Sequence, residues 1–201
     1  MSFKFQPFNR TDVVYKTISK APLTATILVP KSAEKGKHPL LAHFHGRGLL
    51  VGDRMFGEWF PLWLLQFAVS REAIVVTPDY RLIPEANGTD ILEDVKDFWD
   101  WVHSSVPSKV SETWPGISVN LSRIAAGRES AVMTQYGTLD ISHFAYNPAP
   151  ANPPSPEKAR MMHPEVPIHV SLQPGSHGFD TMSTMDDAWV KEGVEFVKKY
   201  W

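Results

Sequence analysis

Cysteine is absent from the 201 residues of this chain, which excludes disulfides, thiolate nucleophiles and cysteine-ligated metals and favours a reducing compartment. Basic residues are not in excess either: Lys and Arg number 20 against 22 Asp and Glu, for a net charge of −2 at pH 7. The sequence therefore lacks the basic footprint of a nucleic-acid binder. No apolar run reaches the roughly 18 residues of a membrane span, and residues 1–16 lack the apolar segment of a signal peptide. We expect a cytoplasmic protein with no nucleic-acid partner and no membrane span.

Apolar residues make up 43% of the chain, which is enough to bury the core of one α/β domain over residues 1–201. Short apolar runs alternate with helix-length segments, and this alternation predicts a mostly parallel sheet with helices on both faces. The predicted sheet contains residues 40–45, 74–78, 122–126 and 168–172. An N-terminal strand pair is expected at 13–18 and 25–29, joined by a loop over 19–24. Helices are expected at 58–72, 89–106 and 186–201.

The clearest of these helices is predicted from the spacing of its apolar residues. Ile91, Val95, Trp99 and Val102 repeat at helical intervals, and Asp90 with Glu93 resembles a capping pair. The last helix carries a similar stripe that begins at Val190.

The stretch HFHGRG at residues 43–48 follows a predicted buried strand. A glycine turn at this point can aim main-chain N–H groups at a developing oxyanion, although a plain turn after a strand would have the same sequence. His43 and His45 lie on one face of the strand and could bind a metal. No third ligand follows at a suitable spacing, so we predict no metal site.

The stretch PDYRLIPEA at residues 78–86, taken together with HFHGRGLLVGD, resembles the hormone-sensitive-lipase-like branch of the α/β-hydrolases, particularly its fungal members. His45, Gly46 and Gly48 match the family's H-G-G-G loop, with Arg47 in place of one glycine. The second family motif, D-Y-R-L-x-P-E, is matched by Asp79, Tyr80, Arg81, Leu82, Pro84 and Glu85. The resemblance implies an α/β-hydrolase fold, action on carboxylic esters and small acyl substrates without metal or cofactor, and a mostly structural role for the second motif.

The resemblance also implies a set of site residues. His177, in QPGSHGFD, stands where the family has its general base, and Ser130 stands where it has its nucleophile. Asp140 follows a G-T-x-D pattern typical of the family's acid. The main-chain amides of Gly46 and Arg47, together with that of Ala131, would form the oxyanion hole.

The region around Ser130 departs from the family pattern. The family typically reads G-E-S-A-G-G, whereas this chain reads Gly127-Arg128-Glu129-Ser130-Ala131-Val132. Only residues 131–139 separate the serine from Asp140, which is too few for a helix and a parallel crossover. This spacing resembles an internal deletion after the nucleophile, with a reduced or missing cap. A strand at 132–136 would have to run antiparallel, and the alternative is a short helix that ends at Gly137.

Three hypotheses for function follow. In the first, Ser130 and His177 hydrolyse a small apolar ester, with Asp140 as the acid. Because of the short spacing after Ser130, we expect that Asp140 does not bind His177 and that turnover is weak. In the second, the protein is catalytically degenerate and binds a small apolar ligand or assists a non-hydrolytic rearrangement such as a cyclisation. In the third, it is a shortened product whose incomplete sheet exposes apolar surface and drives the formation of a homodimer.

Overall fold

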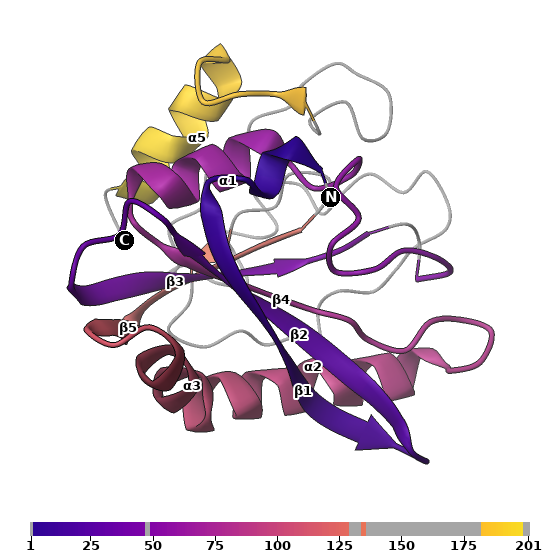
Figure 1. The fold of residues 1–201 in the computed structure, drawn as a ribbon. Helices are drawn as coiled ribbons and strands as arrows, with labels where there is room; N and C mark the ends of the chain where they lie inside the picture. Colours follow the sequence, from indigo (N-terminus) through magenta and orange to yellow (C-terminus); the bar gives the residue numbers. More distant parts are fainter. Residues whose placement is uncertain (1, 47–48, 129–133, 136–181, 199–201) are drawn as a thin grey trace, which may run out of the picture.

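The computed structural model of the chain describes residues 2–46, 49–128, 134–135 and 182–198 (Figure 1). The strands are β1 (Phe8–Ile18), β2 (Ala21–Pro30), β3 (Gly36–Phe44), β4 (Ile74–Pro78), β5 (Ile117–Arg128) and β6 (Thr134–Gln135). The helices are the 3₁₀ turn η1 (Phe3–Phe5) and the α-helices α1 (Leu62–Ser70), α2 (Gly88–Ser104), α3 (Val106–Thr113) and α5 (Ala188–Lys198).

The strands in this part of the chain form one sheet in the order β1-β2-β4-β3-β5-β6. The central strand β3 runs parallel to both β4 and β5, and the other pairs are antiparallel. The predicted runs 40–45, 74–78 and 122–126 therefore do lie in one sheet, as neighbours. The fourth run, 168–172, lies outside the described residues.

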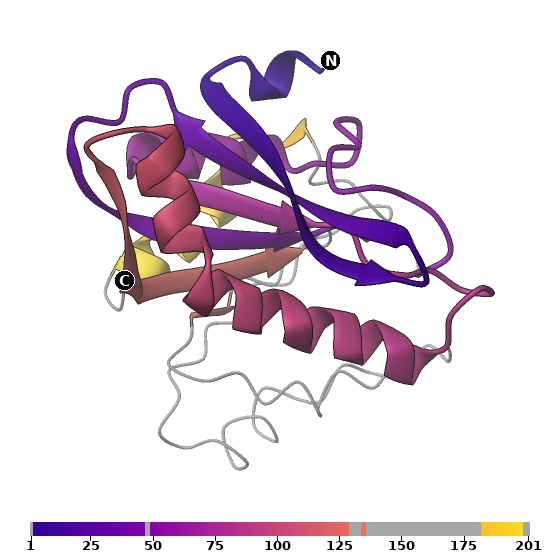
Figure 2. The ribbon, with the colours of Figure 1, turned by 60° about the horizontal axis from the view of Figure 1, so that its bottom comes forward.

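Helices cover both faces of the sheet, as the sequence predicts. Figure 1 shows α1 and α5 on one side of the strands and α2 with α3 on the other, and Figure 2 shows the same layers turned. Alternate residues of each central strand point to opposite layers: Leu41 and Val75 pack with α1 and α5, whereas Leu40 and Val76 pack with α2 and α3. All four side chains are fully buried, which explains why these strands read as continuous apolar runs.

The N-terminal strand pair forms a longer and tighter hairpin than the sequence predicts. The expected loop over 19–24 is wrong, because β1 ends at Ile18 and β2 already begins at Ala21. Only Ser19 and Lys20 form the turn, and both have left-handed backbone angles, with φ of 46° and 75°. Two such residues form the tight turn whose twist matches that of paired strands.

Helix α2 is confirmed, but its buried face and its cap differ from those expected. Val95 and Trp99 are only half-buried, whereas Asp94 and Phe98 are fully buried. Ile91 and Val102 are buried as predicted, but between them the apolar spacing misplaced the stripe because a carboxylate occupies the middle of the buried face. The predicted Asp90–Glu93 capping pair is also wrong, since Asn87 and Asp90 form the capping box.

Helix α3 was not predicted. Its sequence is polar, and only Val106 and Val110 are buried, so the apolar pattern that marks a helix is almost absent. Pro107 lies in the first turn, where no intrahelical bond needs its missing N–H. In α5, by contrast, Val190, Val194 and Val197 are buried as expected.

Replacing Asn87 by alanine is expected to lower the free energy of unfolding by about 1 kcal/mol, as is typical for the loss of an N-cap. The Asn87 side chain accepts from the Asp90 amide at 3.0 Å, and the Asp90 carboxylate accepts from the Asn87 amide at 2.9 Å. Urea denaturation of Asn87→Ala would measure the loss. Asn87→Asp keeps the acceptor and serves as the control, so an equal loss in both variants would contradict the capping role.

Candidate functional site

The turn that begins at His45 and Gly46 lies at the carboxyl end of β3, beside the segment that follows β4. Ligands of parallel α/β sheets bind at this end of the strands. Gly46 is described by the structure, and Arg47, the second predicted oxyanion donor, lies outside the described residues.

Tyr80 holds the His45 end of this turn. Its hydroxyl donates a hydrogen bond to the main-chain carbonyl of His45. The two rings are stacked almost parallel, with centroids 4.2 Å apart and an interplanar angle of 4°. Both residues are buried, so the turn is attached to the segment after β4 by a contact shielded from water.

Arg54 holds the far end of the same loop. Its main-chain N–H donates to Asp79 Oδ1 at 2.8 Å, and its guanidinium forms an ion pair with the same carboxylate. Arg54 Nε also donates to Thr26 Oγ1 at 2.8 Å. Between these points the carbonyl of Leu49 accepts from the Ile83 amide at 2.8 Å. The residues after β4 therefore hold the loop after β3 at three positions.

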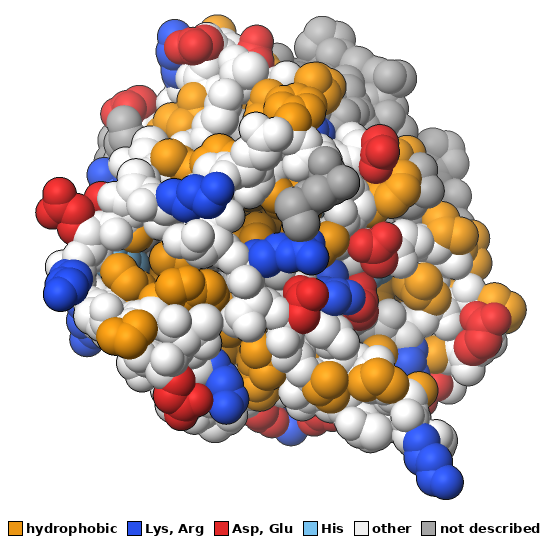
Figure 3. All heavy atoms as spheres, viewed as in Figure 1, with side chains coloured by type: hydrophobic (Ala, Val, Ile, Leu, Met, Phe, Trp, Pro, Cys, Tyr) orange, Lys and Arg blue, Asp and Glu red, His pale blue; other side chains and the backbone are white. Residues whose placement is uncertain are grey.

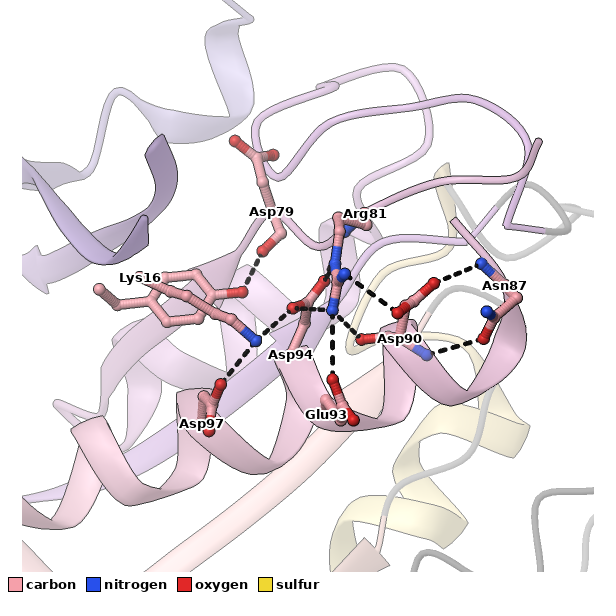
Figure 4. A network of polar contacts seen from close by, with 9 residues as sticks. Lys16, Asp79, Arg81, Asn87, Asp90, Glu93, Asp94 and Asp97 are labelled. Carbon is pink, nitrogen blue, oxygen red and sulfur yellow. Dashed lines mark hydrogen bonds and ion pairs between the residues drawn. The ribbon is translucent and has the colours of Figure 1, made fainter. Parts of the chain in front are cut away.

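Arg81 joins the same segment to α2 (Figure 4). Its Nε donates to Asp94 Oδ2 at 2.8 Å, and its main-chain N–H donates to that oxygen at 3.0 Å. Lys16, from the hairpin, reaches Asp94 Oδ1 at 2.7 Å. Burial alone would raise the pKa of the Asp94 carboxyl, but the hydrogen bonds from Arg81 and Lys16 outweigh it and hold this pKa below its usual value.

These contacts support the structural role expected for the motif that begins at Asp79. Its first three residues bind, respectively, the loop after β3, the carbonyl of His45 and helix α2. The partners Arg54, Asp94 and Lys16 were missed by sequence reasoning. A fully buried carboxylate is unusual unless it is paired, but the sequence gives no sign that Asp94, rather than the neighbouring carboxylates of α2, is the buried one.

His43 is a buried, uncharged residue rather than an exposed ligand. Its Nδ1 lies 3.2 Å from the Thr77 hydroxyl, which itself donates to the carbonyl of Arg54. The donor between His43 Nδ1 and the Thr77 hydroxyl depends on the tautomer of the imidazole. Burial, together with a smaller contribution from the nearby His45, lowers the pKa of His43 to about 3. The ring is stacked on Phe60, with centroids 3.9 Å apart.

Metal binding by His43 and His45 finds no third partner in the described part of the chain. Across residues 2–46, 49–128 and 182–198, no group of three or more His, Asp or Glu side chains could hold a metal ion.

A wide hollow of about 610 Å³ lies beside the same loop. Its lining joins η1, the loop after β3 and the start of the C-terminal segment, and consists of Ser2, Phe3, Lys4, Asp53, Met55, Phe56, Gly57, Glu58 and Met182. The lining is apolar and charged in similar measure. On the face of the molecule seen in Figure 3, side chains of both charge signs are interspersed with apolar ones. Among the described helices, none is long and apolar enough to cross a membrane.

All three predicted catalytic residues fall outside the part of the chain that the structure describes. Ser130, Ala131, Asp140 and His177 all lie outside the described residues, so the roles predicted for them stay predictions. One neighbouring observation bears on them. Residues Thr134–Gln135 run antiparallel to β5, with Ala125 opposite Gln135 and Ala126 opposite Thr134. Of the two arrangements expected after Ser130, these residues adopt the antiparallel strand.

Comparison with known proteins finds carboxylesterases. The chain is 44% identical over 115 residues to probable carboxylesterase M8 of Phoma sp. (strain ATCC 20986 / MF5453), covering 55% of this chain and 36% of that protein. It is 51% identical over 51 residues to probable carboxylesterase clz11 of Cochliobolus lunatus, covering 23% of each. Among solved structures, an esterase of the archaeon Pyrobaculum calidifontis matches with a TM-score of 0.47 and 24% identity, over 60% of this chain and 34% of that one.

No family model matches the chain. The chain spans about a third or less of the length of the two carboxylesterases that it matches. Over about half of its own length it is similar in sequence to a carboxylesterase.

Proposed function

We propose that this protein is a carboxylic-ester hydrolase in which Ser130 is the nucleophile and His177 the general base. The observation that carries the proposal is the turn at His45 and Gly46. It lies at the carboxyl edge of the parallel strands, and a buried tyrosine fixes it there. The similarity to two carboxylesterases supports the reaction class.

In the proposed reaction, Ser130 Oγ attacks the carbonyl carbon of the ester while His177 accepts its proton. The carbonyl oxygen becomes an oxyanion, which accepts hydrogen bonds from the amides of Gly46, Arg47 and Ala131. Collapse of this intermediate expels the alcohol, which takes the proton from His177. Water, activated by the same histidine, then releases the acid and restores Ser130.

The hollow beside the loop after β3 supports a small substrate with an apolar part. Phe3, Met55, Phe56 and Met182 provide apolar contact area along its lining. Small apolar esters and acyl groups match this lining, and no metal or cofactor takes part in the proposed reaction.

We also propose that turnover is low. The antiparallel strand β6 supports this part of the proposal. A nucleophile serine of an α/β-hydrolase normally lies on a turn between a strand and a helix. In this chain β5 ends at Arg128, before Ser130, and the described residues after it return as a strand at Thr134. This is the arrangement expected of a member of the hormone-sensitive-lipase-like branch with an internal deletion after the nucleophile.

The same strand favours one alternative function. A protein whose serine lacks the usual helix and whose acid is displaced could bind a small apolar ligand without hydrolysing it, or assist a rearrangement such as a cyclisation. In that case the hollow would bind ligand, while a covalent serine probe would not react.

The test combines turnover with covalent labelling. Purified protein is assayed with p-nitrophenyl butyrate and treated with a fluorophosphonate probe, which reacts with activated serines. Labelling and turnover that disappear in Ser130→Ala but persist in Ser111→Ala, a change at an exposed serine of α3, would support the hydrolase. A folded wild-type protein with neither activity would exclude it in favour of the ligand-binding alternative.

Replacing Asp140 by asparagine is expected to change kcat by less than about two-fold. Removing the acid from an assembled triad costs about four orders of magnitude, because the histidine loses the partner that fixes its tautomer. We expect no such partnership here, since a strand that returns antiparallel carries the chain away from the serine end of β5. Steady-state kinetics of Asp140→Asn would measure the change, and a loss above a hundred-fold would restore a complete triad.

A further inference from the structure

The contact between Tyr80 and His45 acts on the peptide unit that contains the proposed oxyanion donor. The carbonyl of His45 and the N–H of Gly46 belong to one peptide group, which is trans. In a trans peptide the C=O and N–H bonds point in opposite directions within a single rigid plane. Whatever fixes the direction of the His45 carbonyl therefore fixes the direction of the Gly46 N–H.

We propose that Tyr80 is a positioning residue whose hydroxyl, bound to the His45 carbonyl, directs the Gly46 amide toward the oxyanion. This inference rests on the proposed ester hydrolysis and adds a residue to it. Tyr80 does not touch the substrate in this scheme, because it acts through the peptide between His45 and Gly46.

The tyrosine is held firmly enough to perform this role. Both of its chain neighbours are anchored by charge: Asp79 pairs with Arg54, and Arg81 pairs with Asp94. Its own ring is buried against the ring of His45. The Tyr80 hydroxyl is therefore held in place relative to the sheet while it binds the turn. Rotation of the His45–Gly46 peptide would break this buried hydrogen bond.

The same hydrogen bond makes the amide a better donor. A carbonyl that accepts a hydrogen bond polarises its peptide, and this strengthens the bond that the N–H on the other side donates. An oxyanion exists only after attack on the ester, so this gain acts on the transition state and not on substrate binding. The effect of Tyr80 should therefore appear in kcat, with KM unchanged.

The first test compares two tyrosines that each donate to a main-chain carbonyl. Tyr80→Phe removes the hydroxyl and retains the stacked ring. Its matched control is Tyr15→Phe, because the Tyr15 hydroxyl also donates to a main-chain carbonyl, that of Asp79 at 2.6 Å, which belongs to the peptide before Tyr80 and not to the His45–Gly46 peptide. We expect Tyr80→Phe to lower kcat by about ten- to a hundred-fold, less than the hundred- to thousand-fold typical of deleting an oxyanion donor outright. Tyr15→Phe should retain kcat.

Thermal unfolding of both variants separates positioning from general destabilisation. Each loses one hydrogen bond, so their melting temperatures should fall by similar amounts while kcat falls only in Tyr80→Phe. Equal losses of kcat in the two variants, or a loss that appears only as a higher KM, would overturn the positioning role.

A second readout does not depend on turnover. His-Gly peptides occur at His45–Gly46 and at His177–Gly178, so protein labelled with ¹³C-carbonyl histidine and ¹⁵N-glycine gives two linked NMR signals. His177→Gln removes one of them and assigns the other. Tyr80→Phe should move the carbonyl and amide resonances of His45–Gly46, and Tyr15→Phe should leave them in place.

The two readouts distinguish the ways in which the inference can fail. Unmoved resonances in Tyr80→Phe overturn the positioning role even if the protein is an active esterase. A wild-type protein without turnover or labelling overturns the proposed function, and with it the catalytic part of this inference, whatever the resonances show. Moved resonances together with an unchanged kcat would mean that the Gly46 amide does not serve the oxyanion.

Discussion

Replacing Asp94 by alanine is expected to lower the free energy of unfolding by about 3 kcal/mol, at the lower end of the range for breaking a buried ion pair by removing one partner. The Asp94 side chain is fully buried, whereas those of Lys16 and Arg81 are 17% and 23% exposed. Its loss leaves two cations without their shared carboxylate. The upper end of the range is not reached, because Lys16 still pairs with Asp97 at 2.6 Å and Arg81 with Asp90 at 3.2 Å, and both cations retain some access to water.

Urea denaturation at pH 7 would measure this loss, with Asp100→Ala as the matched control. Asp100 lies on the same helix and pairs with Lys96, but both side chains are largely exposed. Exposed pairs of this kind contribute little to stability, so the control should unfold like the wild type. A similar loss in the two variants would show that the cost comes from removing any carboxylate of this helix and not from breaking the buried network.

The contribution of Asp94 should also fade in acid. Its pKa is held below the ordinary value in the folded protein, so the folded state binds its proton less readily than the unfolded chain does. The stabilisation is therefore complete above the unfolded pKa of about 4 and is lost as the pH falls through the folded value. The difference between wild type and Asp94→Ala should shrink accordingly below pH 4.

A second large effect on the free energy of unfolding is expected from the titration of His43, which begins at a higher pH than that of Asp94. Its pKa is lowered from 6.5 to about 3 by burial, so between these values the unfolded chain binds a proton that the folded protein does not. Stability is then complete above pH 6.5 and falls with pH until the folded residue titrates near pH 3. Each pH unit in this window costs about 1.4 kcal/mol, so pH 4.5 should remove about 2–3 kcal/mol relative to pH 7.

His43→Gln removes the titrating group and should remove this slope. The informative quantity is the difference in unfolding free energy between wild type and variant as a function of pH, because all other titrating groups cancel. That difference should change by about 2–3 kcal/mol between pH 7 and pH 4.5. Parallel stability curves would show that His43 takes up a proton in the folded protein near its ordinary pKa.

The central strands and the major helices were predictable because their burial is uniform or periodic. β4 is five consecutive buried residues, and such a run has few alternatives when turns flank it. The face of α2 that is buried was not predictable from its apolar residues alone. Asp94 lies on that face because it pairs with Lys16 and Arg81, which are elsewhere in the chain. Helix α3 was not predicted, because two buried valines do not form a recognisable apolar stripe.

The candidate site shows a similar division. Local motifs identified the turn at Gly46 and the segment that begins at Asp79, and each is a continuous stretch. The contacts between them join residues far apart, such as Tyr80 to His45 and Arg54 to Asp79. These pairings follow from β4 lying next to β3 in the sheet, which local sequence spacing does not encode. The placement of Ser130, Asp140 and His177 remains a prediction.

The strand order also has a consequence for how the chain assembles. β2 pairs with β4, which is made only after β3 and α1, and Lys16 of the hairpin binds Asp94, 78 residues further along the chain. A two-stranded hairpin is at best marginally stable by itself in water, and contacts between distant residues form slowly. During synthesis, the hairpin of β1 and β2 therefore cannot dock until β4 and most of α2, roughly sixty residues further along the chain, have been made. The hairpin is thus made before the strands and the helix on which it docks, and it is among the last parts of this fold to become stable.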